Sequence, residues 1–223
     1  MTTALLLLSA IMVIVVGWLV SKTINTAPWA EHRAIDIARG DGALNLHPVQ
    51  VGLGVFLAVA TSLFALLISA YHMRMAEADW VSISLPKVLW LNTAVLILAS
   101  VAMHGTLMVA RRGQMDAVRK GLIAAGVFTF AFFAGQIWAW QQLSATGHFT
   151  AANPAYAFFL LLTALHGIHL FGGMLVWARA TSRVVRRVDV KKVRLSVELC
   201  TVYWHFLLLV WAVLFAVLLH TQQ

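Results

Sequence analysis

Six long apolar segments constrain this chain more than any other feature. They run over residues 3–20, 49–71, 86–109, 121–143, 156–178 and 196–219. A helix needs roughly 20 apolar residues to cross the hydrocarbon core of a bilayer. A spanning segment must also satisfy its own backbone hydrogen bonds, which a helix does and an isolated strand does not. The sequence therefore predicts an all-α polytopic membrane protein with six transmembrane helices.

The composition agrees with a membrane protein. Hydrophobic residues make up 61% of the chain and charged residues 11%, whereas a soluble domain has about a quarter charged residues. The single cysteine, Cys200, excludes a disulfide framework within the chain and a multi-cysteine metal site. A net charge of +8 is compatible with a protein that binds nucleic acid. The basic residues lie between the apolar segments, however, so we expect no nucleic-acid partner.

The basic residues alternate between the connections and so predict an orientation. The first, third and fifth connections hold three, four and seven Lys and Arg residues, which is 14 of the 16 in the chain. Loops on the cytoplasmic side of a membrane carry this excess. These three connections are predicted to be cytoplasmic, and both termini to lie on the outer, periplasmic side.

The polar stretch 21–47 is the longest break between apolar segments. It predicts two parts: residues 1–47, an extra N-terminal transmembrane helix with a polar cytoplasmic connection, and residues 48–223, a five-helix bundle. A cleaved signal peptide is the alternative for the first segment. It is disfavoured because the start, MTTALLLL, has no basic residue and no A-x-A site precedes Lys22.

Three histidines fall near mid-membrane, where an ionisable residue is a functional hypothesis by default. His166, His169 and His205 are candidates either for haem ligation or for hydrogen bonds between helices, each worth about 0.6–2 kcal/mol. His166 and His169 lie on one helical face, about 60° apart, so they cannot be the opposed axial ligands of one haem. Packing is the favoured interpretation, and haem ligation stays open.

Small and aromatic residues accompany these histidines. Gly167, Gly172 and Gly173 would let helices approach closely, although glycine is common in membrane helices generally. In the last segment, two pairs of residues seven apart share a face: these are Glu198 with His205 and Trp204 with Trp211. The pattern predicts a protein-facing stripe, with lipid-facing filler as the alternative, and the Tyr203 hydroxyl needs a partner.

Two stretches resemble a known family. YAFFLLLTALHGIHLFGGM (156–174) and VELCTVYWHFLLLVW (197–211) are similar to the last two helices of subunit III of the haem-copper terminal oxidases, that is, of cytochrome c and quinol oxidases. Three weaker matches follow the family's order, at residues 56–71, 85–100 and 132–140. The resemblance covers residues 48–222.

The resemblance implies a non-redox accessory subunit of a respiratory complex that reduces oxygen and translocates protons. It further implies that subunits I and II are partners, that haem and copper belong to those partners, and that this chain binds phospholipid. The expected location is the bacterial inner membrane. We expect no catalytic residue, metal ligand or cofactor in this chain.

Several positions depart from the family pattern. Family carboxylates fall on Ala60, Ala139 and Leu208 here, whereas Glu198, the three histidines and both tryptophans are retained. These losses put a direct proton role in doubt and favour docking and lipid contact. The one extra helix at residues 3–20 fits neither the larger relatives, which have two, nor the quinol-oxidase forms, which have none.

The fifth connection is strongly basic. We expect it to contact anionic lipid headgroups, at about 1 kcal/mol per charge; the residues concerned are Arg183, Arg186, Arg187, Lys191 and Lys192. The alternative is that these charges only fix the orientation of the chain in the membrane.

Two other functions remain open for the chain as a whole, a small b-type membrane cytochrome and an accessory chain of a nitric oxide reductase. A transporter is disfavoured because the spans lack deep acidic residues.

Overall fold

A computed structural model of the chain describes residues 48–145, 153–186 and 190–220. The first apolar segment and the polar stretch that follows it lie outside the described residues. The predicted N-terminal helix and the predicted division at residue 47 therefore stay predictions.

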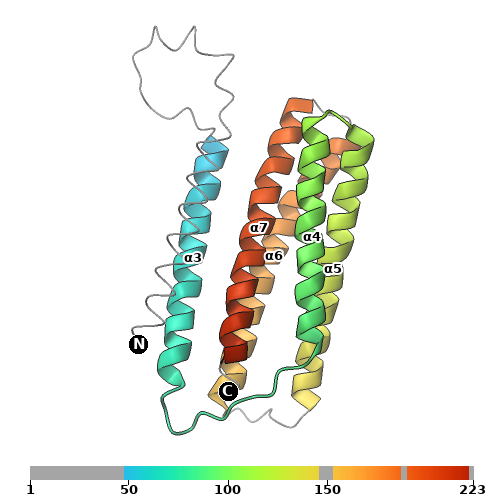
Figure 1. Cartoon of the computed structure of the whole chain (residues 1–223). Helices are drawn as coiled ribbons and strands as arrows, with labels where there is room; N and C mark the ends of the chain where they lie inside the picture. Colours follow the sequence, from blue (N-terminus) through green and yellow to red (C-terminus); the bar gives the residue numbers. More distant parts are fainter. Residues whose placement is uncertain (1–47, 146–152, 187–189, 221–223) are drawn as a thin grey trace, which may run out of the picture. The chain divides into compact units, whose positions relative to one another are not determined.

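Five helices make up the described part of the chain (Figure 1): α3 (Pro48–Arg74), α4 (Val88–Arg111), α5 (Met115–Ala145), α6 (Pro154–Val185) and α7 (Val190–His220). All five are long and apolar enough to cross a membrane. The five later segments predicted from the sequence are thus confirmed as helices.

The helices extend beyond the apolar segments. Residue 178 was the predicted end of α6, yet the helix continues to Val185 and includes Arg179 and Arg183. Hydropathy locates only the part of a helix that suits hydrocarbon, whereas Arg is a good helix former and continues the helix into the polar zone. No Gly or Pro interrupts residues 174–185.

Local sequence sets where individual helices begin and end. The side chain of Asn153 accepts a hydrogen bond from the backbone N–H of Ala155 at 3.0 Å, and Pro154 occupies the first turn of α6. Between α4 and α5, Gly113 adopts φ +75°, a left-handed conformation that favours glycine. Residues 112–114 therefore suffice to reverse the chain.

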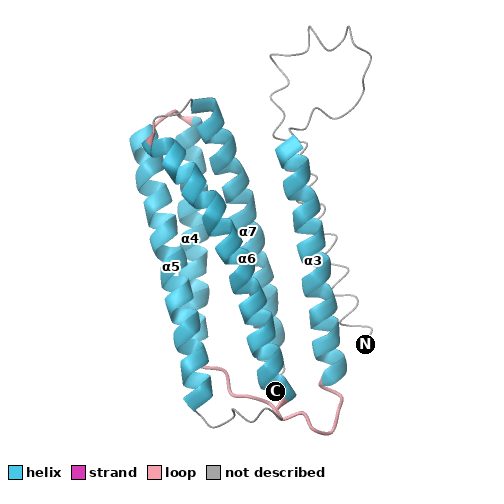
Figure 2. Cartoon of the chain, turned by 180° about the vertical axis from the view of Figure 1, so that it is seen from behind, coloured by secondary structure: helices cyan, strands magenta, loops and turns pink. Residues whose placement is uncertain are grey.

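The chain divides into two compact units at Leu66, within α3. Residues 67–220 contain a four-helix bundle in which α4 packs against α5 and α7, and α6 packs against the same two helices (Figure 2). Because short connections join antiparallel neighbours, α4 and α6 run one way while α5 and α7 run the other.

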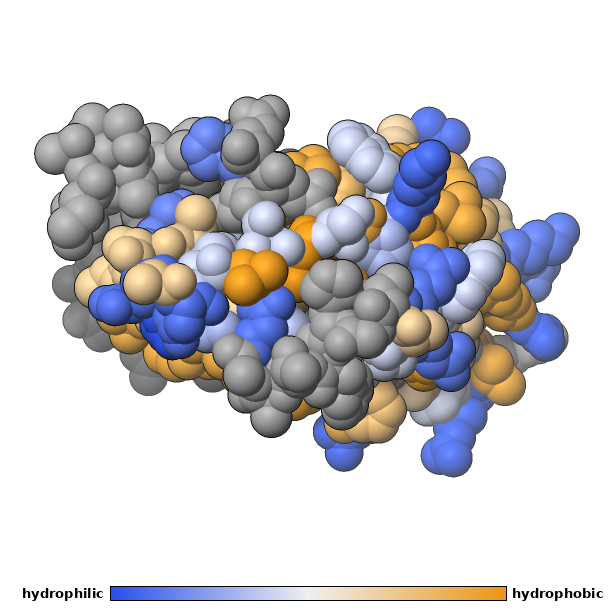
Figure 3. Space-filling model, turned by 90° about the horizontal axis from the view of Figure 1, so that it is seen from below, coloured by the Kyte–Doolittle hydropathy of each residue, from blue (hydrophilic) through white to orange (hydrophobic). Residues whose placement is uncertain are grey.

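The end of this unit that carries the α3–α4 connection exposes a mixture of polar and apolar side chains. Viewed from that end, hydrophilic side chains lie among apolar ones (Figure 3). The guanidinium of Arg74 donates two hydrogen bonds to the Asp79 carboxylate there, and these hold the pKa of Asp79 below its usual value. Many large side chains along the helices are instead exposed and apolar, among them Trp90, Ile168 and Phe171, as a lipid-facing surface requires.

One glycine of α6 lies at a close approach to α7. A Cβ atom on Gly173 would come within 2.6 Å of Cε1 and 2.9 Å of Cδ1 of Tyr203. A Cβ on the adjacent Gly172 would meet no described atom within 4 Å, and one on Gly167 would come only to 4.0 Å from Phe133. The close contact of α6 with α7 therefore depends on Gly173.

We predict that Gly173→Ala destabilises the bundle and that Gly172→Ala does not. The added methyl group would displace the Tyr203 ring, and overpacking of this kind costs about 1–3 kcal/mol. The measurement is the midpoint of thermal unfolding of the purified complex in detergent. Equal midpoints for the two variants would contradict the packing of Tyr203 against Gly173.

Candidate functional site: polar contacts between the helices

The two tryptophans of α7 that lie seven residues apart face into the bundle. Trp204 is 0% and Trp211 1% exposed. Trp204 Nε1 donates a hydrogen bond to Thr129 Oγ1 of α5 at 3.2 Å, and Trp211 Nε1 donates one to Thr93 Oγ1 of α4 at 3.0 Å. The tryptophan pair thus joins α7 to two other helices.

Aromatic contacts surround Trp211. Its ring lies 5.0 Å from that of Phe132 at 89° and 5.2 Å from that of His166 at 76°. Such edge-to-face pairs add about 0.5–1.5 kcal/mol beyond the burial of area. The indole is therefore held by its ring as well as by its N–H group.

His166 is fully buried between α6 and α7. Its Nε2 lies 3.4 Å from the carbonyl oxygen of Leu207, and because a carbonyl only accepts, Nε2 carries the hydrogen and donates it. Its Nδ1 has no partner among the described residues, and the same holds for Nε2 of buried Gln136. The amide oxygen of Gln136 accepts a hydrogen bond from Asn92 Nδ2 at 3.4 Å. The interior of the bundle therefore contains polar groups among its apolar side chains.

His169 has a different environment, although it lies one turn away. Its Nδ1 donates to the carbonyl oxygen of Leu165 in its own helix, at 2.8 Å. Its backbone carbonyl accepts a hydrogen bond from the Tyr203 hydroxyl, also at 2.8 Å. His166 thus bonds to α7 through its side chain, and His169 through its backbone.

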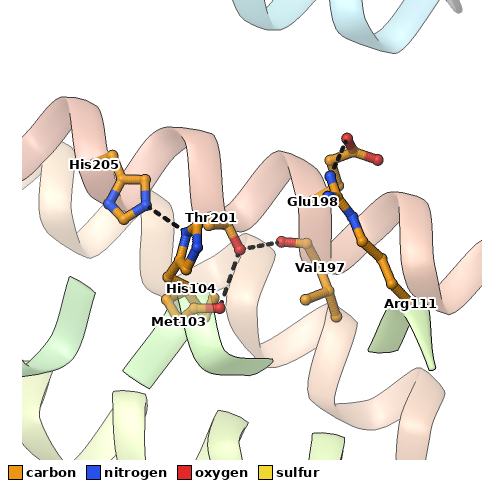
Figure 4. Close-up of polar contacts among 7 residues, drawn as sticks. All are labelled: Met103, His104, Arg111, Val197, Glu198, Thr201 and His205. Atoms are coloured by element: carbon orange, nitrogen blue, oxygen red, sulfur yellow. Dashed lines mark hydrogen bonds and ion pairs between the residues drawn. The ribbon is translucent and has the colours of Figure 1, made fainter. Parts of the chain in front are cut away.

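His205 contacts α4. Its Nδ1 lies 2.5 Å from Ser100 Oγ. Its Nε2 lies 3.3 Å from His104 Nδ1, the contact drawn in Figure 4. Ser100 is buried, His205 half-buried and His104 exposed. The three side chains therefore form a hydrogen-bonded chain that leads from the interior of the bundle to its surface.

Further polar contacts follow the same two helices. Thr201 Oγ1 lies 2.8 Å from the Val197 carbonyl oxygen of its own helix and 3.3 Å from that of Met103 in α4. Arg111 Nη2 lies 3.5 Å from Glu198 Oε1 (Figure 4). We name these contacts the α4–α7 polar row; its side chains are Ser100, His104, Arg111, Glu198, Thr201 and His205.

Sequence reasoning did not single out several members of this site. Ser100, His104, Thr93 and Thr129 are polar residues within apolar segments, and that property alone was the available signal. Their partners lie on other helices, so the spacing along the chain does not identify them.

The predicted lipid-contacting residues fall partly within the described chain. Arg183 Nη1 donates to Ser196 Oγ at 2.7 Å, and Arg186 is exposed at the end of α6. Arg187 lies outside the described residues, as do the side chains of Lys191 and Lys192.

The three positions at which the resemblance led us to expect carboxylates lie on different helices. Ala60 belongs to α3, Ala139 is fully buried in α5, and Leu208 is half-buried in α7. Across residues 48–145, 153–186 and 190–220, no group of three or more His, Cys, Asp and Glu residues is arranged to hold a metal ion.

Comparison with known proteins identifies the family. The family model "Cytochrome c oxidase subunit III" matches residues 8–222. Cytochrome c oxidase subunit 3 of Thermostichus vulcanus is 27% identical over 180 residues, which cover 75% of this chain and 85% of the relative. The probable cytochrome c oxidase subunit 3 of Mycobacterium tuberculosis (strain H37Rv) is 26% identical over 179 residues, covering 76% and 86%.

A quinol oxidase is also among the relatives. Cytochrome bo(3) ubiquinol oxidase subunit 3 of Buchnera aphidicola is 22% identical over 169 residues, covering 74% of this chain and 82% of the relative. The family match spans nearly the whole sequence and agrees with five long apolar helices. This chain therefore belongs to the cytochrome c oxidase subunit III family of the haem-copper oxidases.

Proposed function

We propose that this chain is a non-redox accessory subunit that stabilises the haem-copper-bearing subunit I of its oxidase and binds phospholipid. Subunit II is the second partner, and haem and copper belong to these partners. The main support is the pairing of both buried indoles of α7 with threonines of α4 and α5. The buried polar groups on this helix serve to hold a rigid bundle together, which is what a docking subunit requires.

The ring nitrogens of the α6 histidines support the same proposal. His166 and His169 each donate one N–H group to a carbonyl oxygen, and these bonds hold the two rings in place within the bundle, as a packing role requires. Alanine and leucine at the three lost-carboxylate positions provide no acid for proton uptake. The electron donor, whether cytochrome c or quinol, would bind on other subunits.

The arrangement of basic residues supports the proposed orientation in the bacterial inner membrane. Since α4 and α6 are parallel, Arg111 at the end of α4 and Arg183 near the end of α6 lie at the same end of the bundle. This end would face the cytoplasm. The extra N-terminal helix at residues 3–20 would then start on the outer side and pack against a neighbouring subunit.

The chain purified alone should show no haem α band after reduction with dithionite, whereas the complex that it co-purifies with should show one. The measurement is the reduced-minus-oxidised visible spectrum of each sample at equal protein concentration. An α band in the isolated chain would establish the alternative of a small b-type cytochrome.

His205→Ala should loosen the association of this chain with the complex without abolishing oxygen reduction. The variant loses hydrogen bonds to Ser100 and His104 of its own chain, and each such bond between membrane helices contributes on the order of 1 kcal/mol to the stability of the bundle that docks. The measurement is subunit retention in detergent together with oxygen consumption. His220→Ala, at the exposed end of the same helix, is the control. An intact complex without turnover would assign His205 to the chemistry instead.

Neutralising Arg183 and Arg186 should reduce the amount of anionic phospholipid that co-purifies with the complex. Each basic residue near the membrane surface contributes about 1 kcal/mol, so each Arg→Gln change should weaken retention roughly fivefold. Native mass spectrometry with phosphatidylglycerol measures the bound lipid. Arg74→Gln, at the opposite end of the bundle, should have little effect, and an equal loss there would exclude a specific role for the α6 end.

A further inference from the structure

His104 is an exposed polar residue on a helix that is otherwise apolar on its outer face. Within the described part of the chain it makes one hydrogen bond, which joins its Nδ1 and Nε2 of His205. Its own Nε2 lies at the opposite edge of the ring. Since Nδ1 already faces α7, Nε2 is the nitrogen that a group outside this bundle would meet.

The depth of His104 limits what that group is. His104 precedes Arg111, the last residue of α4, by seven residues, which is about 10 Å along the helix axis. Helical side chains lean toward the N-terminus of the helix, so the imidazole is directed away from the basic end. Lipid phosphates stay in the headgroup layer, and acyl chains carry no hydrogen-bonding group. A polar nitrogen left unpaired in hydrocarbon costs several kcal/mol.

The surface beside His104 suits the approach of a helix. A Cβ atom on Gly105 would meet no described atom within 4 Å, and a neighbouring helix approaches most closely where a small residue lies on the surface. Val101 and Met108, one turn away on either side of His104, are 61% and 48% exposed and apolar. The patch thus combines one hydrogen-bonding nitrogen with apolar contacts on both sides.

We propose that a transmembrane helix of another subunit of the oxidase docks on this α4 patch and pairs a hydrogen-bonding side chain with His104 Nε2. The inference rests on the proposed function and adds the face and the chemistry of the contact. Ser100 and His205 position the imidazole from inside the bundle. If the partner side chain is an acceptor, each group donates outward: the Ser100 hydroxyl to His205, His205 to His104, and His104 Nε2 to the partner. If the partner is a donor, every one of these hydrogen bonds has the opposite direction. In both cases all four ring nitrogens are hydrogen-bonded.

The direct test places the photo-cross-linking residue p-benzoylphenylalanine at position 104 in the complex, in native membranes. Irradiation should link this chain to another subunit of the oxidase. The same residue at the exposed Phe130 of α5 is the control for background. Cross-links from position 104 to lipid alone, or to residues 1–66 of this chain, would overturn the proposal.

A second test measures retention of the chain in the detergent-solubilised complex. His104→Phe keeps an aromatic ring but removes Nε2 together with Nδ1. The loss of the Nε2 contact should raise the dissociation constant about threefold, from an average of about 0.6 kcal/mol per interhelical bond. Met108→Leu, one turn away, preserves the apolar contact and should match the native chain. Equal retention of all three would overturn the proposal.

The two tests also separate this inference from the function on which it rests. If the native chain does not co-purify with a haem-bearing subunit, the proposed function is wrong. If it co-purifies but position 104 does not cross-link to a subunit, only the docking face is wrong.

Discussion

The orientation of α7 depends on two indole N–H groups in an apolar bundle. Each threonine hydroxyl that accepts an indole hydrogen also donates its own: Thr129 to the Ala125 carbonyl at 2.7 Å, and Thr93 to the Leu89 carbonyl at 2.8 Å. The bond to the carbonyl fixes the orientation of each hydroxyl group, so its oxygen can accept the indole hydrogen from a limited range of directions. Since lipid gives no hydrophobic drive for helices to associate, directional contacts of this kind set the rotation of a helix about its axis.

Once the rotation of α7 is set, the other faces of the helix follow. With Trp204 and Trp211 directed to α5 and α4, the neighbouring Tyr203 is placed against Gly173 of α6. His205 then falls opposite Ser100 and His104. The buried contacts of α7 and the α4–α7 polar row thus both follow from the rotation of α7 about its axis. The exposed end of that row is where the bundle presents a polar group to its surroundings.

The sequence predicted the five described helices because their apolar length is a local property of the chain. The predicted limits fell short where helices continue past the hydrocarbon, as α6 does to Val185, since helix propensity and hydropathy differ for arginine. The motif at 156–174 also identified the family, which the comparison established independently.

The partners of the site residues were beyond sequence reasoning. His205 shares a helical face with Glu198, yet both of its ring nitrogens bond to α4, and nothing in the spacing of either helix gives that pairing. His166 and His169 appear equivalent in the sequence, but burial separates them: one is fully enclosed and the other bonds to its own helix. Such differences arise from packing between segments that are distant in the chain.

The short reversal at residues 112–114 has a consequence for how the protein enters the membrane. With Gly113 in a left-handed conformation, the Gly113 and Gln114 N–H groups bond back to the Ala110 and Val109 carbonyls at 3.1 Å, so these two N–H groups need no partner outside the turn. Because α4 and α5 follow each other directly in the chain, we expect them to form a helical hairpin through local contacts, which form fastest. This hairpin presents Thr93 and Thr129 together before α7 has been synthesised, and the last helix arrives at a template that is already complete.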